Sequence, residues 1–215
     1  WTGFLALLFF IIATYNSGFS IDNKKPNSLV YIENYDTKTA YFGTYNTTLD
    51  TYTKQIFKDD FTKGGIENAE TKSKYNTPFN YTKKTAYKAI SSSEIKTELD
   101  TLIGKKRFLE LTITPKRKIN ILQFLTKSKL TLYQFKVNDE LVNKGKKHSL
   151  KSGTFLVYRL GNNDKEVTLS FSVNVDQNLE LTLNEVSYDL RTNKNFNLKP
   201  RAEDMMPMPF VTNDA

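Results

Sequence analysis

Cysteine is absent from this sequence, and histidine occurs only once, at position 148. The absence of cysteine excludes thiol catalysis, thiolate metal sites and disulfide bonds. A single imidazole also excludes zinc sites that use several histidines. Glycine and proline are sparse, at 9 and 6 of 215 residues, which excludes collagen-like and proline-rich low-complexity chains. The sequence therefore offers few of the side chains on which catalysis and metal binding usually depend.

Apolar and aromatic residues, in contrast, are sufficient for a folded core. Hydrophobic residues make up 39% of the chain, and the aromatic residues comprise 15 Phe, 12 Tyr and 1 Trp. A chain of 215 residues with this composition fits one large domain, or one domain plus attachments. Extensive disorder is excluded, because disordered chains lack this amount of apolar side chain.

The first 16 residues are predicted to be the end of a transmembrane helix. Residues 1–15 (WTGFLALLFFIIATY) carry no charge and are mostly apolar. As a helix they would extend about 22 Å, whereas a bilayer core of about 30 Å needs about 20 residues. We therefore expect a membrane helix whose beginning has been cut off. The h-region of a signal peptide and a buried core helix are the alternatives. The polar segment 17–27 is typical of a linker.

Alternation of apolar and polar residues dominates the body of the chain, residues 28–199. Ser28–Glu33 and Thr39–Tyr45 are expected to form a hairpin. Further strands are predicted at Arg107–Thr114, Ile119–Leu125, Leu130–Val137, Gly153–Leu160, Val167–Val175 and Leu179–Leu190. Their spacing is typical of an antiparallel sandwich or barrel. We expect a mainly β fold, a jelly-roll-like β-sandwich with one short helix.

Three segments depart from this pattern. Leu49–Lys58 places its apolar residues on one helical face, which predicts the short helix, packed on the sheet. Ser91–Ile103 fits a helix, through a capping box at Ser91 and Glu94, or a strand, and we expect the strand. Residues 58–85, rich in Lys, Thr, Asn and Gly, are expected to form a long polar loop.

Residues 200–215 are expected to form an extended tail rich in methionine and proline. Pro207 and Pro209 lack amide donors, so they exclude a regular helix or a central strand there. Two interpretations remain open. In one, the tail lies over its own domain and its methionines fill surface grooves. In the other, it docks onto another domain of the same polypeptide through Arg201, Met205, Met206 and Met208.

The net charge of +8 raises the question of nucleic-acid binding. The basic clusters Lys105–Arg107, Lys116–Lys118 and Lys144–Lys147 lie at predicted turns, where lysines commonly protect sheet edges. The sequence contains no phosphate-binding loop, RNA-binding aromatic motif or zinc finger beside them. We therefore expect no nucleic-acid partner.

His148 is the one histidine that a general base or a Ser-His-Asp triad would use. No Gly-x-Ser-x-Gly motif accompanies it, and we expect an exposed loop histidine. We assign no catalytic, cofactor-binding or metal-binding residue to this chain. Asn46 and Asn80 begin N-glycosylation patterns. A secreted or surface-anchored glycan-binding module, with tyrosines stacking on sugars, is the alternative function.

Two passages of the sequence resemble a known family. They are KKPNSLVYIENYDTKTAYFGTYNTTLDTYTKQIF and KPRAEDMMPMPFVTNDA. Both are similar to the C-terminal, extracytoplasmic region of membrane-bound zinc metallopeptidases of peptidase family twenty-eight, bacterial relatives of the endoplasmic reticulum metallopeptidase. The matching positions are Asn27–Tyr31, Thr39–Tyr45, Leu49–Thr53, Arg201 and Met206–Pro209. The resemblance covers residues 1–57 and 196–215, and the strands between them are only generically similar.

The resemblance implies a zinc exopeptidase domain, several transmembrane helices, and then this β-rich domain on the periplasmic or luminal side of the membrane. Histidines and carboxylates hold the zinc of such peptidases, and His148 alone cannot supply them. We therefore expect a non-catalytic accessory domain that binds no cofactor itself, while the parent peptidase domain holds zinc. Its expected partners are the lipid bilayer, through residues 1–16, and the peptidase domain, on which it packs or to which it gates access.

Overall fold

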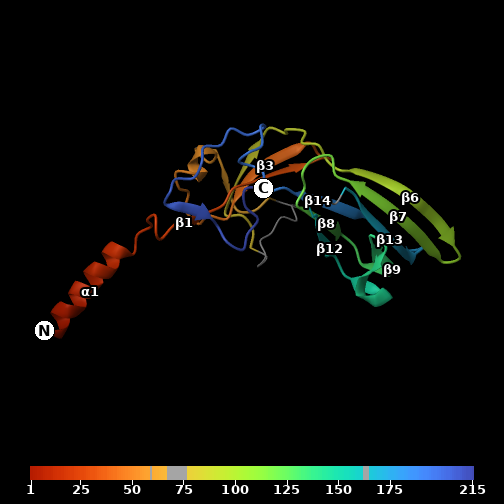
Figure 1. Ribbon diagram of the computed structural model, residues 1–215, viewed down its shortest axis with the longest axis horizontal. Coiled ribbons are helices and arrows are strands. Elements are labelled where there is room, and N and C mark those ends of the chain that lie inside the picture. The colour runs from red at the N-terminus through yellow and green to blue at the C-terminus, as the bar shows by residue number, and fades with distance from the viewer. Residues whose placement is uncertain (59, 67–76, 162–164) are drawn as a thin grey trace. The chain divides into compact units, whose positions relative to one another are not determined.

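The alternating segments fold as strands, so the protein is mainly β, as the sequence predicts, with one α-helix and several antiparallel sheets (Figure 1). The computed structural model describes residues 1–58, 60–66, 77–161 and 165–215. They divide into two compact units: unit 1 comprises residues 1–89 and 189–215, and unit 2 comprises residues 90–188. The sequence analysis groups residues 28–199 in one domain, because alternation marks strands but does not say which strands share a core.

Unit 1 contains a four-stranded antiparallel sheet in the order β2-β3-β5-β4. The expected hairpin is confirmed as β2 (Val30–Asn34) and β3 (Thr39–Thr44). β5 (Tyr81–Thr85) pairs with β3 on one side and with β4 (Thr62–Lys63) on the other. The prediction of a polar loop is therefore wrong at Thr62–Lys63 and Tyr81–Thr85, which form strands. The sequence YTKKT gives no apolar signal, and backbone pairing to β3 holds it in the sheet. Residues 59 and 67–76 of that loop lie outside the described residues.

Aromatic side chains fill the core of unit 1. The rings of Tyr45 and Phe79 pack 4.5 Å apart. Gly43 lies under the ring of Phe79, where a Cβ atom would approach that ring to 2.9 Å, so only glycine fits there. Phe196, in the stretch 196–215 that is called the tail from here on, packs at 4.6 Å on Tyr31. The core therefore combines residues from both ends of the chain.

The predicted helix Leu49–Lys58 is wrong: the structure has only η1, a three-residue 3-10 helix (Thr53–Gln55). Hydrogen bonds between Asp50 and Thr53 form here in place of a regular helical turn. The amide of Thr53 donates to Asp50 Oδ1 at 2.9 Å, and the amide of Asp50 donates to Thr53 Oγ1 at 2.9 Å. Such side-chain to backbone bonds compete with helix formation. Tyr52 and Phe57 on either side are buried and anchor the turn.

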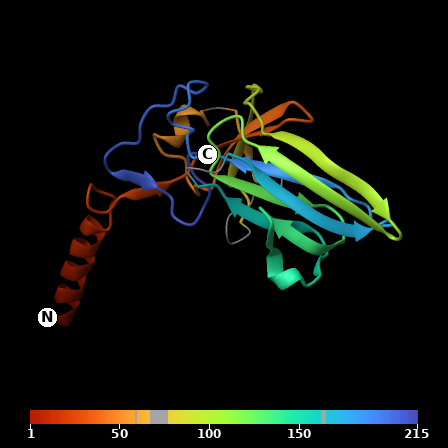
Figure 2. The ribbon, with the colours of Figure 1, turned by 45° about the vertical axis from the view of Figure 1, so that its right-hand side comes forward.

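Unit 2 contains two antiparallel sheets, which can be followed in Figure 2. The larger has the order β10-β9-β13-β7-β6, with β11 also paired to β9. Its strands are β6 (Glu94–Ile103), β7 (Lys106–Thr114), β9 (Leu130–Val137), β10 (Glu140–Leu141), β11 (His148–Leu150) and β13 (Val167–Asn174). The smaller comprises β12 (Gly153–Arg159), β8 (Ile121–Thr126) and β14 (Leu181–Val186), in that order. A 3-10 element, η2 (Val142–Gly145), follows β10. The strand expected within Ser91–Ile103 is confirmed as β6.

Both sheets of unit 2 contribute alternate side chains to one apolar core. Phe135 of β9 is fully buried, and its ring lies 6.0 Å from Phe155 of β12 and 6.2 Å from Phe171 of β13. Burial of one such side chain contributes about 1.5–3 kcal/mol. The core of unit 2 therefore rests on packing across the two sheets.

β6 is a long and exposed edge strand. It pairs only with β7 in the sheet order, and its apolar side chains at Ile95, Leu99, Leu102 and Ile103 are exposed. A register shift between Thr97 and Leu99 and charged residues along the strand interrupt this edge. Bulges and charges are common ways of protecting an edge against pairing with another chain.

A segment that follows α1 (Thr2–Asn16) pairs with a segment near the C-terminus in unit 1. β15 (Met205–Pro207) pairs in parallel with β1 (Lys25–Asn27). Before them, α1 (Thr2–Asn16) forms the helix expected for residues 1–16. Within the described residues, no helix has the length and apolar character needed to cross a membrane.

Truncation of the fully buried Phe135 to alanine should destabilise unit 2 by about 3–5 kcal/mol, because it leaves a cavity between the sheets. The measurement is urea unfolding, with hydrogen exchange of β9 and β13 as the local readout. Val157→Ala is the matched control: Val157 is 48% exposed and should cost about 0.5 kcal/mol or less. Equal losses for the two variants would contradict this account of the core.

Candidate functional site

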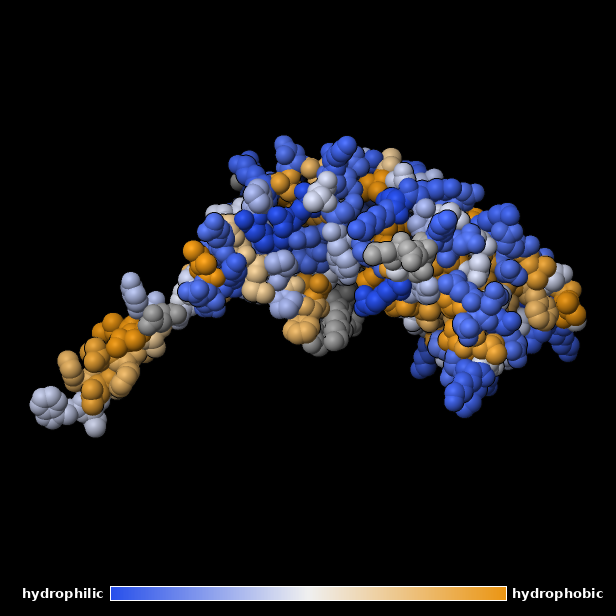
Figure 3. All heavy atoms as spheres, viewed as in Figure 1, coloured by the Kyte–Doolittle hydropathy of each residue, from blue (hydrophilic) through white to orange (hydrophobic). Residues whose placement is uncertain are grey.

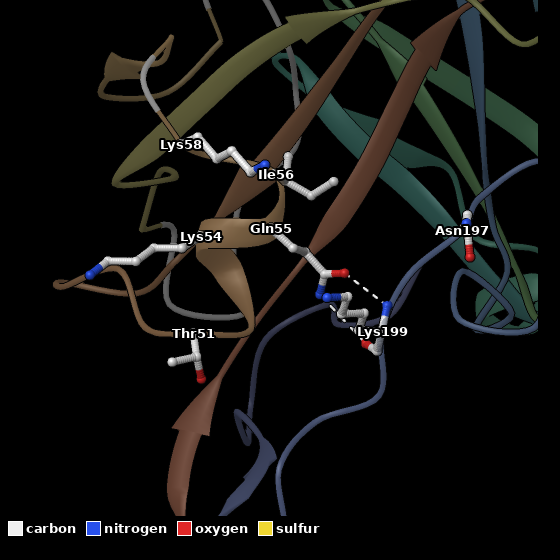
Figure 4. Close-up of a pocket in the computed structure, with 7 residues that line it drawn as sticks. All are labelled: Thr51, Lys54, Gln55, Ile56, Lys58, Asn197 and Lys199. Atoms are coloured by element: carbon white, nitrogen blue, oxygen red, sulfur yellow. Dashed lines mark hydrogen bonds between the residues drawn. The ribbon is translucent and has the colours of Figure 1, made fainter.

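A groove of about 490 Å³ lies in unit 1, around η1 (Figure 4). Two stretches of the chain that are distant in sequence form its walls. Residues 51–58 supply Thr51, Lys54, Gln55, Ile56 and Lys58, and the tail supplies Asn197 and Lys199. The groove thus brings three lysines to one surface.

Hydrogen bonds of Asp50 hold the wall formed by η1 in place. The backbone carbonyl of Asp50 accepts a hydrogen bond from the amide of Lys54 at 2.8 Å, and its carboxylate Oδ1 accepts from the amide of Thr53 at 2.9 Å. Its other carboxylate oxygen accepts from the side-chain amide of Asn27 at 3.1 Å. The buried side chains of Tyr52 and Phe57 also attach this turn to the core, and they thereby fix the backbone position of Lys54.

Gln55 joins the second wall to the first. Its Oε1 accepts a hydrogen bond from the amide of Lys199 at 2.8 Å, and its Nε2 donates to the Lys199 carbonyl at 3.5 Å (Figure 4). Nε2 also donates to the carbonyl of Tyr52 at 2.8 Å. The Gln55 amide therefore pairs with the tail backbone as a neighbouring strand would, and this places Lys199 beside η1.

The charged side chains that are described along the groove are all positive. None of the seven described residues that line it is acidic. Within the described part of the chain, the ion pairs with acidic side chains involve none of Lys54, Lys58 and Lys199. Among nearby carboxylates, Asp214 is paired with Arg201. A surface lined by charges of one sign attracts ligands of the opposite sign.

Arg201 follows Lys199 by two residues and lies in a largely buried cluster of polar side chains. Its guanidinium donates to both carboxylate oxygens of Asp214, from Nη1 at 2.6 Å and from Nη2 at 2.8 Å. It also donates from Nε to Asn27 Oδ1 and from Nη2 to Asn213 Oδ1. The Arg201 side chain is 5% exposed. Paired, charge-assisted bonds of this kind are strong and geometrically specific.

Tyr52 borders the same cluster. The Arg201 guanidinium lies 4.4 Å from the centre of its ring, and its hydroxyl donates to Asp214 Oδ1 at 3.3 Å. Burial, with the negative charge of Asp214 as a smaller cause, raises the pKa of Tyr52 to about 12. Burial also raises the pKa of Tyr45 to about 12. Both phenols therefore stay neutral at physiological pH and serve as packing and hydrogen-bonding groups.

The four residues expected at an interdomain contact serve mainly unit 1 itself. Arg201 is buried in its cluster, and the sulfur of Met205 accepts a hydrogen bond from Asn27 Nδ2 at 3.3 Å. Met208 packs against the aromatic core. Met206 has the most exposed side chain of the four, at 37%. The contacts agree with a tail that lies over its own unit, and docking onto another domain stays a prediction, to which Met206 contributes the most accessible surface.

His148 is not the exposed loop residue that the sequence predicts. It begins β11, pairs with Leu132 of β9, and lies half-buried with its ring 6.5 Å from that of Phe135. In the ranges that the structure describes, no cluster of three or more histidines and carboxylates is placed to hold a metal ion.

The asparagines of the two glycosylation patterns have structural roles. Asn46 is 3% exposed, and its Oδ1 accepts from the Ser28 amide at 2.8 Å. Asn80 Nδ2 donates to the carbonyl of Tyr45 at 2.8 Å. A glycan on Asn46 would require this buried network to open, so the pattern marks a packing residue of the folded unit.

Sequence reasoning missed the lysine groove. Lys54 and Lys58 lie in the predicted helix, and Lys199 is remote from them in sequence, so no local pattern connects them. The tertiary contact through Gln55 is what assembles the groove. No family model, curated protein or solved structure matches this chain. The site is therefore interpreted from its own geometry.

Replacement of Arg201 by methionine should destabilise unit 1 by about 3 kcal/mol, because it leaves the largely buried Asp214 carboxylate without its partner. Urea unfolding measures the loss, and hydrogen exchange at residues 25–27 and 205–207 should reveal release of the tail. The control is Arg107→Met: Arg107 and Asp100 form a similar pair but are 39% and 42% exposed, so its loss should cost about 1 kcal/mol or less. An Arg201→Met variant as stable as the control would refute the role given to this cluster.

Proposed function

We propose that this chain is the non-catalytic accessory β-domain of a membrane-anchored zinc exopeptidase of the aminopeptidase type, located outside the cytoplasm. Its β-units, including a jelly-roll-like sandwich, pack on the peptidase domain or gate access to it. Helix α1 attaches the chain to the lipid bilayer. Zinc belongs to the peptidase domain of the parent polypeptide. The support for the peptidase is the sequence resemblance at residues 1–57 and 196–215.

Helix α1 carries the proposal of a membrane anchor. Every large apolar side chain from Phe4 to Ile12 is at least 41% exposed, and no charged residue lies between Thr2 and Asn16. This surface is visible in Figure 3 as a nearly continuous hydrophobic helix. A helix that is apolar on all sides is stable in a protein core or in a membrane. The side chains of α1 are not buried by the rest of the chain, which favours the membrane.

The anchor is tested by flotation of the full chain with neutral phosphatidylcholine vesicles. The wild-type chain should float with the vesicles, whereas Leu8→Asp with Phe9→Asp should reduce the bound fraction at least about tenfold. Each aspartate costs about 2.5–3.5 kcal/mol at the centre of a membrane helix. Leu102→Asp with Ile103→Asp is the matched control, because these residues are also exposed and apolar but lie on β6. Flotation lost equally in both double variants would exclude α1 as the specific anchor.

The peptidase part of the proposal is tested in the gene that encodes this chain. The reading frame upstream of Trp1 should encode further hydrophobic spans and a domain rich in His, Asp and Glu. The purified chain alone should show no aminopeptidase activity and should lose added zinc on dialysis. A frame that lacks such a domain, or a chain that retains stoichiometric zinc, would reject the assignment.

A further inference from the structure

The lysine groove of unit 1 holds a concentration of positive charge that the described residues around it do not neutralise. Lys54, Lys58 and Lys199 line one groove, and none of them pairs with an acidic side chain of the described residues. Other basic side chains of the protein do find such partners, as in the pairs Lys116–Glu94 and Arg117–Glu185. The groove therefore lacks a counter-charge that a ligand can supply.

The groove is built rather than incidental. Gln55 fixes the tail backbone at Lys199 to η1 through two hydrogen bonds, and Asp50 fixes the start of η1. The tail is held in turn by the buried Arg201 cluster. Both walls are thus positioned before any ligand arrives, which lowers the ordering cost of binding.

We propose that this groove binds an extended acidic peptide segment, with Lys54, Lys58 and Lys199 contacting its aspartate or glutamate carboxylates. The proposal goes beyond the accessory function and holds whether or not the parent protein is a peptidase. The segment's apolar atoms would lie on Ile56 and on the methylene stems of the lysines, which present apolar surface below their charged ends.

The dimensions and lining of the groove favour a peptide over other anions. A volume of about 490 Å³ falls in the range of sites for organic ligands and is large for a single inorganic anion. None of the seven lining residues is aromatic, so the groove lacks the ring surfaces on which sugars stack. The three ammonium groups come from separate positions along the walls, which suits carboxylates spaced along a chain.

Binding is tested with the full chain in a neutral detergent and a fluorescently labelled peptide, Glu-Glu-Leu-Glu-Glu, by fluorescence anisotropy at low salt. The triple variant Lys54→Gln, Lys58→Gln and Lys199→Gln should weaken binding at least about tenfold, as expected for the loss of three ionic contacts. Raising the ionic strength to about 0.3 M should weaken wild-type binding similarly, because exposed charge interactions are screened.

A second triple variant of equal charge controls for net charge. Lys144→Gln, Lys146→Gln and Lys147→Gln removes three exposed lysines from unit 2 and should change binding by no more than about twofold. Equal weakening by both triple variants, or no binding of the peptide by the wild-type chain, overturns the proposal. Inorganic phosphate and hyaluronan serve as competitors: either one displacing the peptide at a lower concentration of charged groups reassigns the groove to that ligand and also overturns it. These outcomes do not bear on the flotation and reading-frame tests, so the two proposals fail separately.

Discussion

The largely buried pair of Arg201 and Asp214 is the interaction on which unit 1 depends. The two charges are costly to remove from water, and the cost is offset only because each hydrogen-bonding group of the guanidinium finds an acceptor. Asn27 and Asn213 complete the shell, and Asn213 Nδ2 returns a bond to the Asn27 carbonyl at 2.9 Å. The cluster therefore ties the tail to the chain that enters the unit, across more than 170 residues of sequence.

The position of the tail follows from this cluster, and the groove follows from the tail. With Arg201 fixed, the backbone at Lys199 reaches Gln55, and Lys199 lines the same groove as Lys54 of η1 and Lys58 beyond it. Parallel pairing of β1 with β15 continues the same contact. The Arg201–Asp214 pair therefore helps to hold the tail in the position at which Lys199 lines the groove.

The two units are stabilised by different means. Unit 2 joins two sheets through an apolar core around Phe135, the arrangement that alternating sequences produce most directly. Unit 1 has a small aromatic core and an extensive buried polar network around Asn27, Asn46 and Asp50, whose bonds must all be made for it to be stable. Substitutions in unit 2 should be tolerated when they conserve volume, whereas those in the network of unit 1 should leave unpaired polar groups.

The sequence by itself determined the mainly β class, the first hairpin, β6 as a strand, and the longer strands of unit 2 but not the short β10 and β11, because alternation reports which faces are buried wherever a strand has one apolar side. It also determined the apolar helix of residues 1–16 and the lack of thiol chemistry. Only the tertiary structure decided the division into two units, the place of the polar strand β5 and the 3-10 turn at Thr53, since pairing and side-chain bonds outweighed local preference there. The same holds for the groove: Lys54 and Lys199 become neighbours through Gln55 and the buried Arg201, and contacts between residues so far apart in the chain leave no periodic signal in the sequence.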